Sequence, residues 1–118
     1  MANGTVTQLR RGVLGPCVLA LLADGPRYGL ELARELEAAG ELLTSQGTLY
    51  PLLGRLHDAQ LVTSRWELGD TDRPRRYYEI TDAGRRELAD FAREWAAFAG
   101  SVGALVPPPS AKPQEEEP

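Results

Sequence analysis

A short helix with one leucine-rich face, followed directly by a β-hairpin, constrains this chain more than any other sequence feature. Apolar residues recur at the i, i+3, i+4 and i+7 spacing of a buried helix face: Leu49, Leu52, Leu53 and Leu56. The opposite face carries small or polar residues, Gly47, Pro51, Gly54 and Asp58. A glycine in an exposed helix costs about 1 kcal/mol relative to alanine. Either this helix approaches a rigid surface closely, or its start is frayed or kinked.

The hairpin that follows has an arginine-rich tip. Residues 62–68 alternate between two faces, residues 69–72 have turn composition, and residues 76–80 alternate again. Three arginines stand within four positions at the tip: Arg73, Arg75 and Arg76. A slim helix followed by a basic hairpin is what a winged helix-turn-helix presents to DNA. We therefore predict an α+β fold, mostly α with a small β-hairpin that forms the wing.

An N-terminal helix is expected before this unit. Residues 14–22 form a nearly continuous apolar run, with Gly15 and Pro16 as a candidate cap and first helical residue. Whether residues 5–13 extend this helix or form a separate turn stays open.

A second helix is predicted over about residues 28–39. Its inner face would consist of Leu32, Ala33, Leu36 and Ala39. Gly40 is a natural stop for it, and Thr44 or Ser45 is expected to cap the leucine-rich helix.

A long C-terminal helix is expected after Thr81, whose hydroxyl would cap it. Large apolar side chains recur along it at spacings of three or four residues: Leu88, Phe91, Trp95, Phe98 and Val102. Such a seam packs against another helix, either in a second copy of the chain or in the chain's own first helix. The predicted organisation is a winged helix-turn-helix over residues 1–80, a dimerisation helix over 81–105 and a disordered acidic, proline-rich tail over 106–118.

The overall charge of the chain argues against a nucleic-acid binder. The net charge at pH 7 is −4 and the isoelectric point is about 5.0. The tail weakens that objection, because its one lysine and three glutamates contribute −2 of the total away from the hairpin. Twelve of the thirteen basic residues are arginine, whose planar fork of donors suits phosphates and guanine edges.

Several other classes of protein find no support in the sequence. The single cysteine, Cys17, excludes an intrachain disulfide and is expected to be a buried structural thiol. The only histidine, His57, has no neighbours at metal-ligand spacing, so neither a metal nor another cofactor is expected. No catalytic constellation is visible, so the chain is not expected to be an enzyme. With no signal peptide and no apolar run of about 20 residues, a cytoplasmic location without a membrane partner is expected.

The chain resembles the PadR family of bacterial transcriptional regulators, specifically the short subfamily with one C-terminal helix. The resemblance covers about residues 13–98. It rests on five strings, Leu19-Ala20-Leu21-Leu22, Tyr28-Gly29-Leu30-Glu31-Leu32-Ala33, Gly47-Thr48-Leu49-Tyr50-Pro51-Leu52-Leu53, Arg73-Pro74-Arg75-Arg76-Tyr77-Tyr78 and Thr81-Asp82-Ala83-Gly84. It implies a homodimeric winged helix-turn-helix, usually a repressor, whose C-terminal helices form the dimer contact. The chain departs from the family at Asp72, where the wing commonly has glycine, and at Leu30, where tyrosine is frequent.

The DNA contacts are predicted at the start of the leucine-rich helix and at the hairpin tip. The start of a recognition helix meets base edges, and an arginine-rich tip reaches phosphates or the minor groove. The predicted contact residues are Tyr28, Ser45, Gln46, Gly47, Thr48, Tyr50, Arg55, Arg73 and Arg75. Tyr50 is alternatively a half-buried rim residue, and Arg76 alternatively lies along the sheet. Tyr77 and Tyr78 are expected to pack on opposite sheet faces.

The predicted partners are a palindromic double-stranded DNA operator and a second copy of the chain. The predicted dimerisation residues are Leu88, Phe91, Trp95 and Phe98. In some short family members, tryptophans of the C-terminal helices flank a pore and stack on flat, often cationic drugs. The resemblance therefore makes Trp95 a candidate ligand-binding residue, with Asp90 and Glu94 as counter-charges. Alternatively Trp95 fills the dimer core, and a third hypothesis is a winged-helix protein-interaction module that does not bind DNA.

Overall fold

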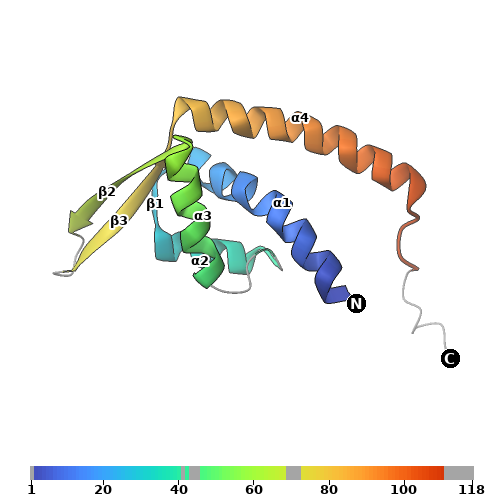
Figure 1. Ribbon diagram of the computed structural model, residues 1–118, viewed down its shortest axis with the longest axis horizontal. Helices are drawn as coiled ribbons and strands as arrows, with labels where there is room; N and C mark the ends of the chain where they lie inside the picture. Colours follow the sequence, from blue (N-terminus) through green and yellow to red (C-terminus); the bar gives the residue numbers. More distant parts are fainter. Residues whose placement is uncertain (1, 41, 43–45, 69–72, 111–118) are drawn as a thin grey trace.

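The computed structural model describes the chain except for residues 1, 41, 43–45, 69–72 and 111–118, and it leaves out the side chains of residues 2–7 and 46. Within the described part, four helices and a three-stranded antiparallel sheet follow one another (Figure 1). Their bounds are α1 Ala2–Ala23, β1 Arg27–Tyr28, α2 Gly29–Ala38, α3 Gln46–Asp58, β2 Val62–Leu68, β3 Pro74–Ile80 and α4 Asp82–Leu105. This is the predicted α+β winged helix-turn-helix with one long C-terminal helix.

The first helix is continuous, so the expected cap at Gly15 and Pro16 is wrong. Pro16 lies inside α1, where it removes one backbone hydrogen bond. Packing outweighs that loss, because the inner side of the same helix segment is buried in the core. Gly15 is buried and faces α3 instead of capping the helix: a Cβ at this position would make an ordinary van der Waals contact with the Leu52 side chain at 3.7 Å.

The core lies where α1, α2, α3 and the base of the sheet meet. Its buried members are Leu14, Val18, Leu19, Leu22, Leu32, Ala33, Leu36, Leu49, Leu52, Leu53, Leu56, Val62, Tyr78 and Ile80. The predicted leucine face of α3 is confirmed. The inner face of α2 is confirmed except at Ala39, which is exposed because the helix has already ended at Ala38. Gly40 adopts φ +116°, a conformation that suits glycine at a helix end. The predicted cap at Thr44 or Ser45 lies outside the described residues.

The sheet has the strand order β1-β3-β2, and all of its pairs are antiparallel. In the β2–β3 hairpin, which we call the wing, Trp66 pairs with Arg76 and Arg65 pairs with Tyr77. Successive side chains of a strand alternate between faces, so Trp66 and Arg76 share one face while Arg65 and Tyr77 share the other. The strand β1 was not predicted.

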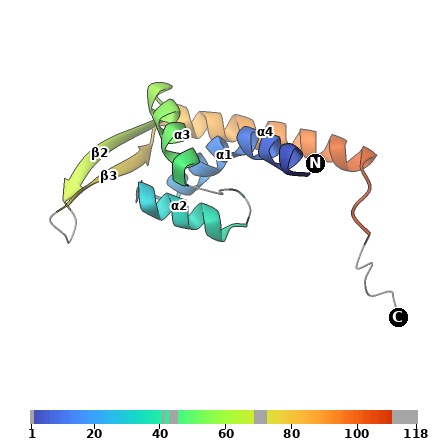
Figure 2. The ribbon, with the colours of Figure 1, turned by 60° about the horizontal axis from the view of Figure 1, so that its bottom comes forward.

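The last helix begins as expected at Thr81, whose Oγ1 accepts a hydrogen bond from the Gly84 backbone N–H at 2.9 Å. Gly84 sits so close to the body that an added Cβ would lie 2.2 Å from the Leu61 carbonyl oxygen. From there α4 runs beside α1 and extends away from the wing (Figures 1 and 2). None of the described helices is both long enough and apolar enough to cross a membrane.

Candidate nucleic-acid interface

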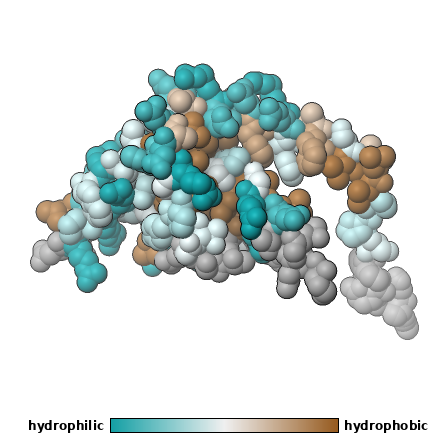
Figure 3. Space-filling view, in the orientation of Figure 1, coloured by the Kyte–Doolittle hydropathy of each residue, from teal (hydrophilic) through white to brown (hydrophobic). Residues whose placement is uncertain are grey.

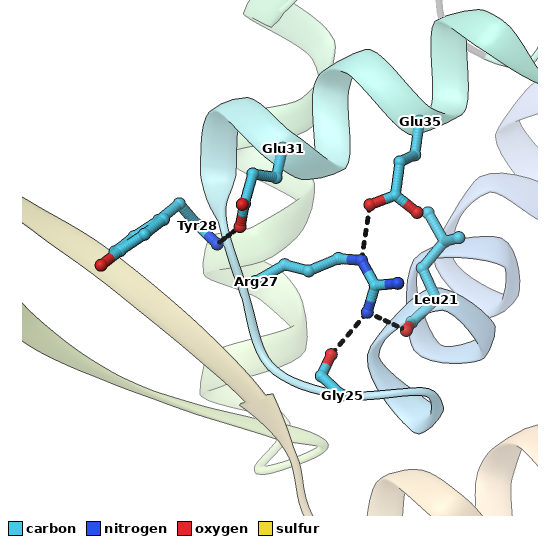
Figure 4. Close-up of polar contacts among 6 residues, drawn as sticks. All are labelled: Leu21, Gly25, Arg27, Tyr28, Glu31 and Glu35. Carbon is cyan, nitrogen blue, oxygen red and sulfur yellow. Dashed lines mark hydrogen bonds and ion pairs between the residues drawn. The ribbon is translucent and has the colours of Figure 1, made fainter. Parts of the chain in front are cut away.

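The start of α2 is held in place by Arg27, which the sequence analysis did not single out (Figure 4). Its Nη1 donates to the carbonyl oxygens of Leu21 and Gly25 at 2.7 and 2.6 Å, and its Nε donates to Glu35 Oε2 at 2.6 Å. The bond to Glu35 raises the pKa of Arg27, although burial opposes this. Arg27 therefore joins the end of α1 to α2.

The outer face of α3 is exposed as the leucine pattern predicted. Gly47, Thr48, Gly54 and Arg55 are all exposed. A Cβ at Gly54 would find no atom within 4 Å, so packing inside the chain does not require glycine there. The stability of the free chain therefore gains nothing from glycine at this position.

Tyr50 is partly packed at the rim of α3, as one of its two interpretations predicted. Its ring packs on Gly29 at the start of α2, where a Cβ would lie 2.8 Å from Tyr50 Cε1. The side chain nevertheless stays 45% exposed. Gly29 thus gives Tyr50 a fixed support, and Tyr50 lines a hollow between α3 and the wing.

We call this hollow the wing hollow, and its volume is about 600 Å³. Its lining combines three arginines with aromatic side chains and the start of α2: Tyr28, Gly29, Leu30, Tyr50, Trp66, Arg73, Pro74, Arg75, Arg76 and Tyr78. A second hollow adjoins it along α3 and includes Gly54, His57 and Asp58. The wing and the exposed side of α3 therefore border one continuous concave surface.

The wing arginines lie on aromatic rings. The guanidinium carbon of Arg75 is 5.1 Å from the centroid of the Tyr28 ring, and Tyr28 in turn contacts Tyr77 at 4.7 Å between centroids. The guanidinium carbon of Arg76 is 4.7 Å from the centroid of Trp66. Stacking of this kind orients a guanidinium without neutralising its charge.

Arg65, which lies on the sheet face opposite to that of Arg76, is neutralised by two carboxylates. Its Nε donates to Glu67 at 2.7 Å and its Nη1 donates to Glu79 at 2.9 Å. These hydrogen bonds raise the pKa of Arg65. Arg65 therefore adds no net positive charge to its face of the wing.

The two adjacent tyrosines of β3 point to opposite faces, as predicted. Tyr78 is buried against the core and Tyr77 is half-buried beside Tyr28. Burial raises the pKa of Tyr78, and the positive charge of Arg76 opposes that rise. Both tyrosines therefore belong to the packing of the wing base.

The structure brings together part of the predicted DNA-contact set. Four of those residues line the wing hollow: Tyr28, Tyr50, Arg73 and Arg75. Three others lie on the exposed face of α3: Gly47, Thr48 and Arg55. Ser45 and the side chain of Gln46 lie outside the described residues. Trp66 and Arg76 also line the hollow but were not predicted there, although the hairpin alternation places them on the same face as Val62 and Ile80.

The C-terminal seam borders a second concave surface, a groove of about 330 Å³ between α1 and α4. Its lining includes Leu9 and Val13 from α1 and Phe91, Trp95 and Phe98 from α4. The rings of Phe91 and Trp95 are stacked with centroids 6.0 Å apart. The alternative in which α4 packs on the first helix is thus realised in part. Trp95 and Phe98 nevertheless remain 46% and 59% exposed.

Fold and surface define a winged helix-turn-helix protein, and comparison with known proteins identifies its family. Residues 18–90 match the model of the transcriptional regulator PadR-like family. Because the match spans more than half of the chain, the protein belongs to the PadR-like family of transcriptional regulators. Members of this family are regulators and not enzymes, and membership implies binding to DNA. The predicted resemblance is confirmed.

Individual relatives agree with this assignment. The chain is similar to a PadR family regulator of Eggerthella lenta, with 36% identity, coverage of 92% of this chain and 94% of that structure, and a TM-score of 0.80. A PadR-like regulator of Bacillus cereus superimposes with a TM-score of 0.76 and 31% identity, covering 86% of this chain and 99% of that one. A transcriptional regulator of Mycobacterium tuberculosis is 35% identical over 95 residues, which are 80% of this chain and 87% of the relative.

Proposed function

We propose that this protein is a homodimeric repressor that binds a palindromic DNA operator through α3 and the wing. One observation carries the proposal: the exposed face of α3 and the arginines of the wing border the same concave surface. Placed in a major groove, α3 would present Thr48 and Tyr50 to base edges, while Arg73 and Arg75 would reach phosphates or the minor groove. The remaining proposed contacts are Tyr28, Ser45, Gln46, Gly47 and Arg55.

The exposed part of the α4 seam supports the dimer, whereas Leu88 and Phe91 are already half-buried within the chain. Two-fold operators require two recognition helices held about 34 Å apart, so a monomer would bind only a half-site. The proposed contact residues are Leu88, Phe91, Trp95 and Phe98. The last two expose large rings that a second copy of α4 would cover.

The decisive experiment measures binding of the full chain to palindromic fragments from the region upstream of its own gene, at several salt concentrations. Replacing Arg73 and Arg75 with Ala should weaken binding to specific and unrelated DNA alike. The slope of log K against log salt should flatten by about 0.9 for each lost phosphate contact. Arg93→Ala, at an exposed position on α4, is the control for a lost positive charge. Wild-type protein without salt-dependent DNA binding would favour a protein-interaction module instead.

A second candidate function is the binding of a flat aromatic cation at Trp95, which the groove between α1 and α4 favours. Glu94 lines this groove and supplies a negative charge, whereas Asp90 is paired with Arg93. In a Trp66→Phe background, such a cation should quench Trp95 emission, and the quenching should vanish in Trp95→Ala while the protein stays dimeric. No quenching across a varied ligand panel would leave Trp95 as a packing residue.

A further inference from the structure

We propose that Arg76, held against Trp66 inside the wing hollow, binds a phosphate of the DNA backbone. The proposal rests on the proposed function and extends it to a residue that no sequence pattern assigned to DNA. Trp66 and Arg76 stand directly opposite each other on β2 and β3. The guanidinium carbon lies 4.7 Å from the indole centroid, and Nη1 lies 3.4 Å from Ser64 Oγ. Neutral groups therefore set the orientation of the guanidinium.

The charge of Arg76 is not neutralised by a carboxylate of the described residues. The four ion pairs found among these residues involve Arg27, Arg65 and Arg93. An arginine has five N–H donors, and the contacts with the side chains of Ser64 and Tyr78 leave other donors for a ligand. Trp66 is 62% exposed, so the stacked pair stands at the surface of the hollow, where an anion can reach it.

The charges around the concave surface indicate where the anion would bind. The wing hollow is lined by Arg73, Arg75 and Arg76, and no carboxylate belongs to its described lining. The adjoining hollow along α3 contains Asp58, which would repel a phosphate. Arg76 lines both hollows, so its partner is expected on the side that faces Tyr50 and the wing tip.

The geometry of the proposed complex makes a backbone phosphate the fitting ligand. When α3 lies in a major groove and the wing tip contacts the flanking backbone or minor groove, the two elements straddle one sugar–phosphate strand. That strand passes over the wing hollow. A guanidinium that stacking has already oriented loses less conformational freedom when it forms paired hydrogen bonds to phosphate oxygens.

The test uses the full chain and a fluorescein-labelled duplex of mixed sequence about 30 base pairs long, enough for two half-sites. Binding is followed by anisotropy over a range of salt concentrations. Arg76→Gln should flatten the slope of log K against log salt by about 0.9 per subunit, so by about 1.8 in a dimer. Arg93→Gln, the matched charge control, should leave the slope unchanged. Thermal unfolding by circular dichroism verifies that each variant is folded.

Two further variants test separately how the charge of Arg76 and the orientation of its guanidinium contribute to DNA binding. Trp66→Leu keeps the charge but removes the stack, so the slope should stay while affinity falls severalfold. Arg76→Lys should also keep the slope, with an affinity between those of wild type and Arg76→Gln, because an ammonium lacks the planar fork. Unchanged affinity in Trp66→Leu would overturn the orienting role of the tryptophan.

The double variant Arg73→Ala/Arg75→Ala, measured in parallel, distinguishes the two proposals. A flattened slope in this variant but not in Arg76→Gln would overturn the Arg76 contact and leave the proposed function standing. An unchanged slope in the double variant together with a flattened one in Arg76→Gln would support the Arg76 contact and remove Arg73 and Arg75 from the mechanism. Wild-type protein that fails to bind the duplex would overturn both.

Discussion

The winged-helix body and the outer part of α4 bury their apolar side chains to very different extents. In the body, side chains such as Leu19, Leu32 and Leu49 are at most 1% exposed. Along α4, Trp95 and Phe98 are about half exposed, and hydrophobic residues gather at its far end (Figure 3). The body completes its core within one chain, whereas α4 does not. Folding stability is therefore concentrated in the body, and we propose that assembly depends on α4.

The first turn of α4 makes a tight contact with the body. Gly84 in the first turn of α4 lies against the Leu61 carbonyl at the start of the wing. The same carbonyl accepts the Thr81 backbone N–H at 3.0 Å. The direction in which α4 leaves the body is consequently fixed at its first turn, and any change there should move the whole seam relative to α3.

The largest effect is expected from Phe98→Asp, which places a charge on the exposed seam. Burying a phenylalanine contributes about 1.5–3 kcal/mol, and a symmetric dimer loses two of them. Light scattering should show a monomer, DNA affinity should collapse, and the body should remain folded. Leu68→Asp, on an exposed apolar residue of the wing, is the control and should leave the oligomeric state unchanged. A dimeric Phe98→Asp variant would contradict the division between body and seam.

A smaller effect is expected at the junction, from Gly84→Ala. The added methyl group would overlap a backbone oxygen that cannot move freely, so the free energy of unfolding should fall by about 1–3 kcal/mol. Urea unfolding at fixed protein concentration measures this. Gly100→Ala in the same helix meets no atom within 4 Å and should raise stability by up to about 1 kcal/mol. Equal effects at the two positions would mean that the junction is not tight.

A third comparison concerns the contact between Gly29 and Tyr50 at the proposed DNA-binding surface. Gly29→Ala should displace the Tyr50 ring, lower stability by about 1 kcal/mol and weaken operator binding. In a Tyr50→Ala background, Gly29→Ala should have little further effect on affinity, as a double-mutant cycle would show.

Gly54→Ala is the matched change on open surface. It should stabilise the free protein by up to about 1 kcal/mol and still weaken operator binding if α3 lies deep in a groove. A stabilised variant that binds the operator as before would leave Gly54 without a role in close approach.

The smallest expected effect concerns how well the body shields the Cys17 thiol from solvent. Cys17 is half-buried and not fully buried as expected. This partial burial raises the pKa of its thiol above the ordinary value of 9.0, so at pH 8 less thiolate is present in the folded than in the unfolded chain. Alkylation by iodoacetamide should therefore be slow in the native protein and fast in urea. The native rate should keep rising as the pH increases past 9. Equal rates in both states would show that the partial burial of Cys17 does not protect its thiol.

Local patterns were enough to predict several elements. The leucines of α3, the alternation of the wing and the cap at Thr81 each depend on neighbours within a few residues, and the structure confirms them. Two features could not be predicted from the sequence because they depend on distant residues. The strand β1 is only two residues long and exists through its pairing with Tyr77 and Tyr78. Pro16 is tolerated inside α1 because the surrounding helix is buried.

The candidate site shows the same division. The leucine spacing identified α3 and its outer face, and the alternating residues with nearby arginines identified the wing. Both patterns depend on residue type and periodicity, which are visible in the sequence alone. The sequence also determined the family, through strings that occur in order along the chain. Only the tertiary structure decided that Arg65 pairs with Glu79 while Arg76 rests on Trp66, and that Gly29 supports Tyr50. Those contacts join separate elements, so their geometry is fixed by how the strands pair and the helices pack.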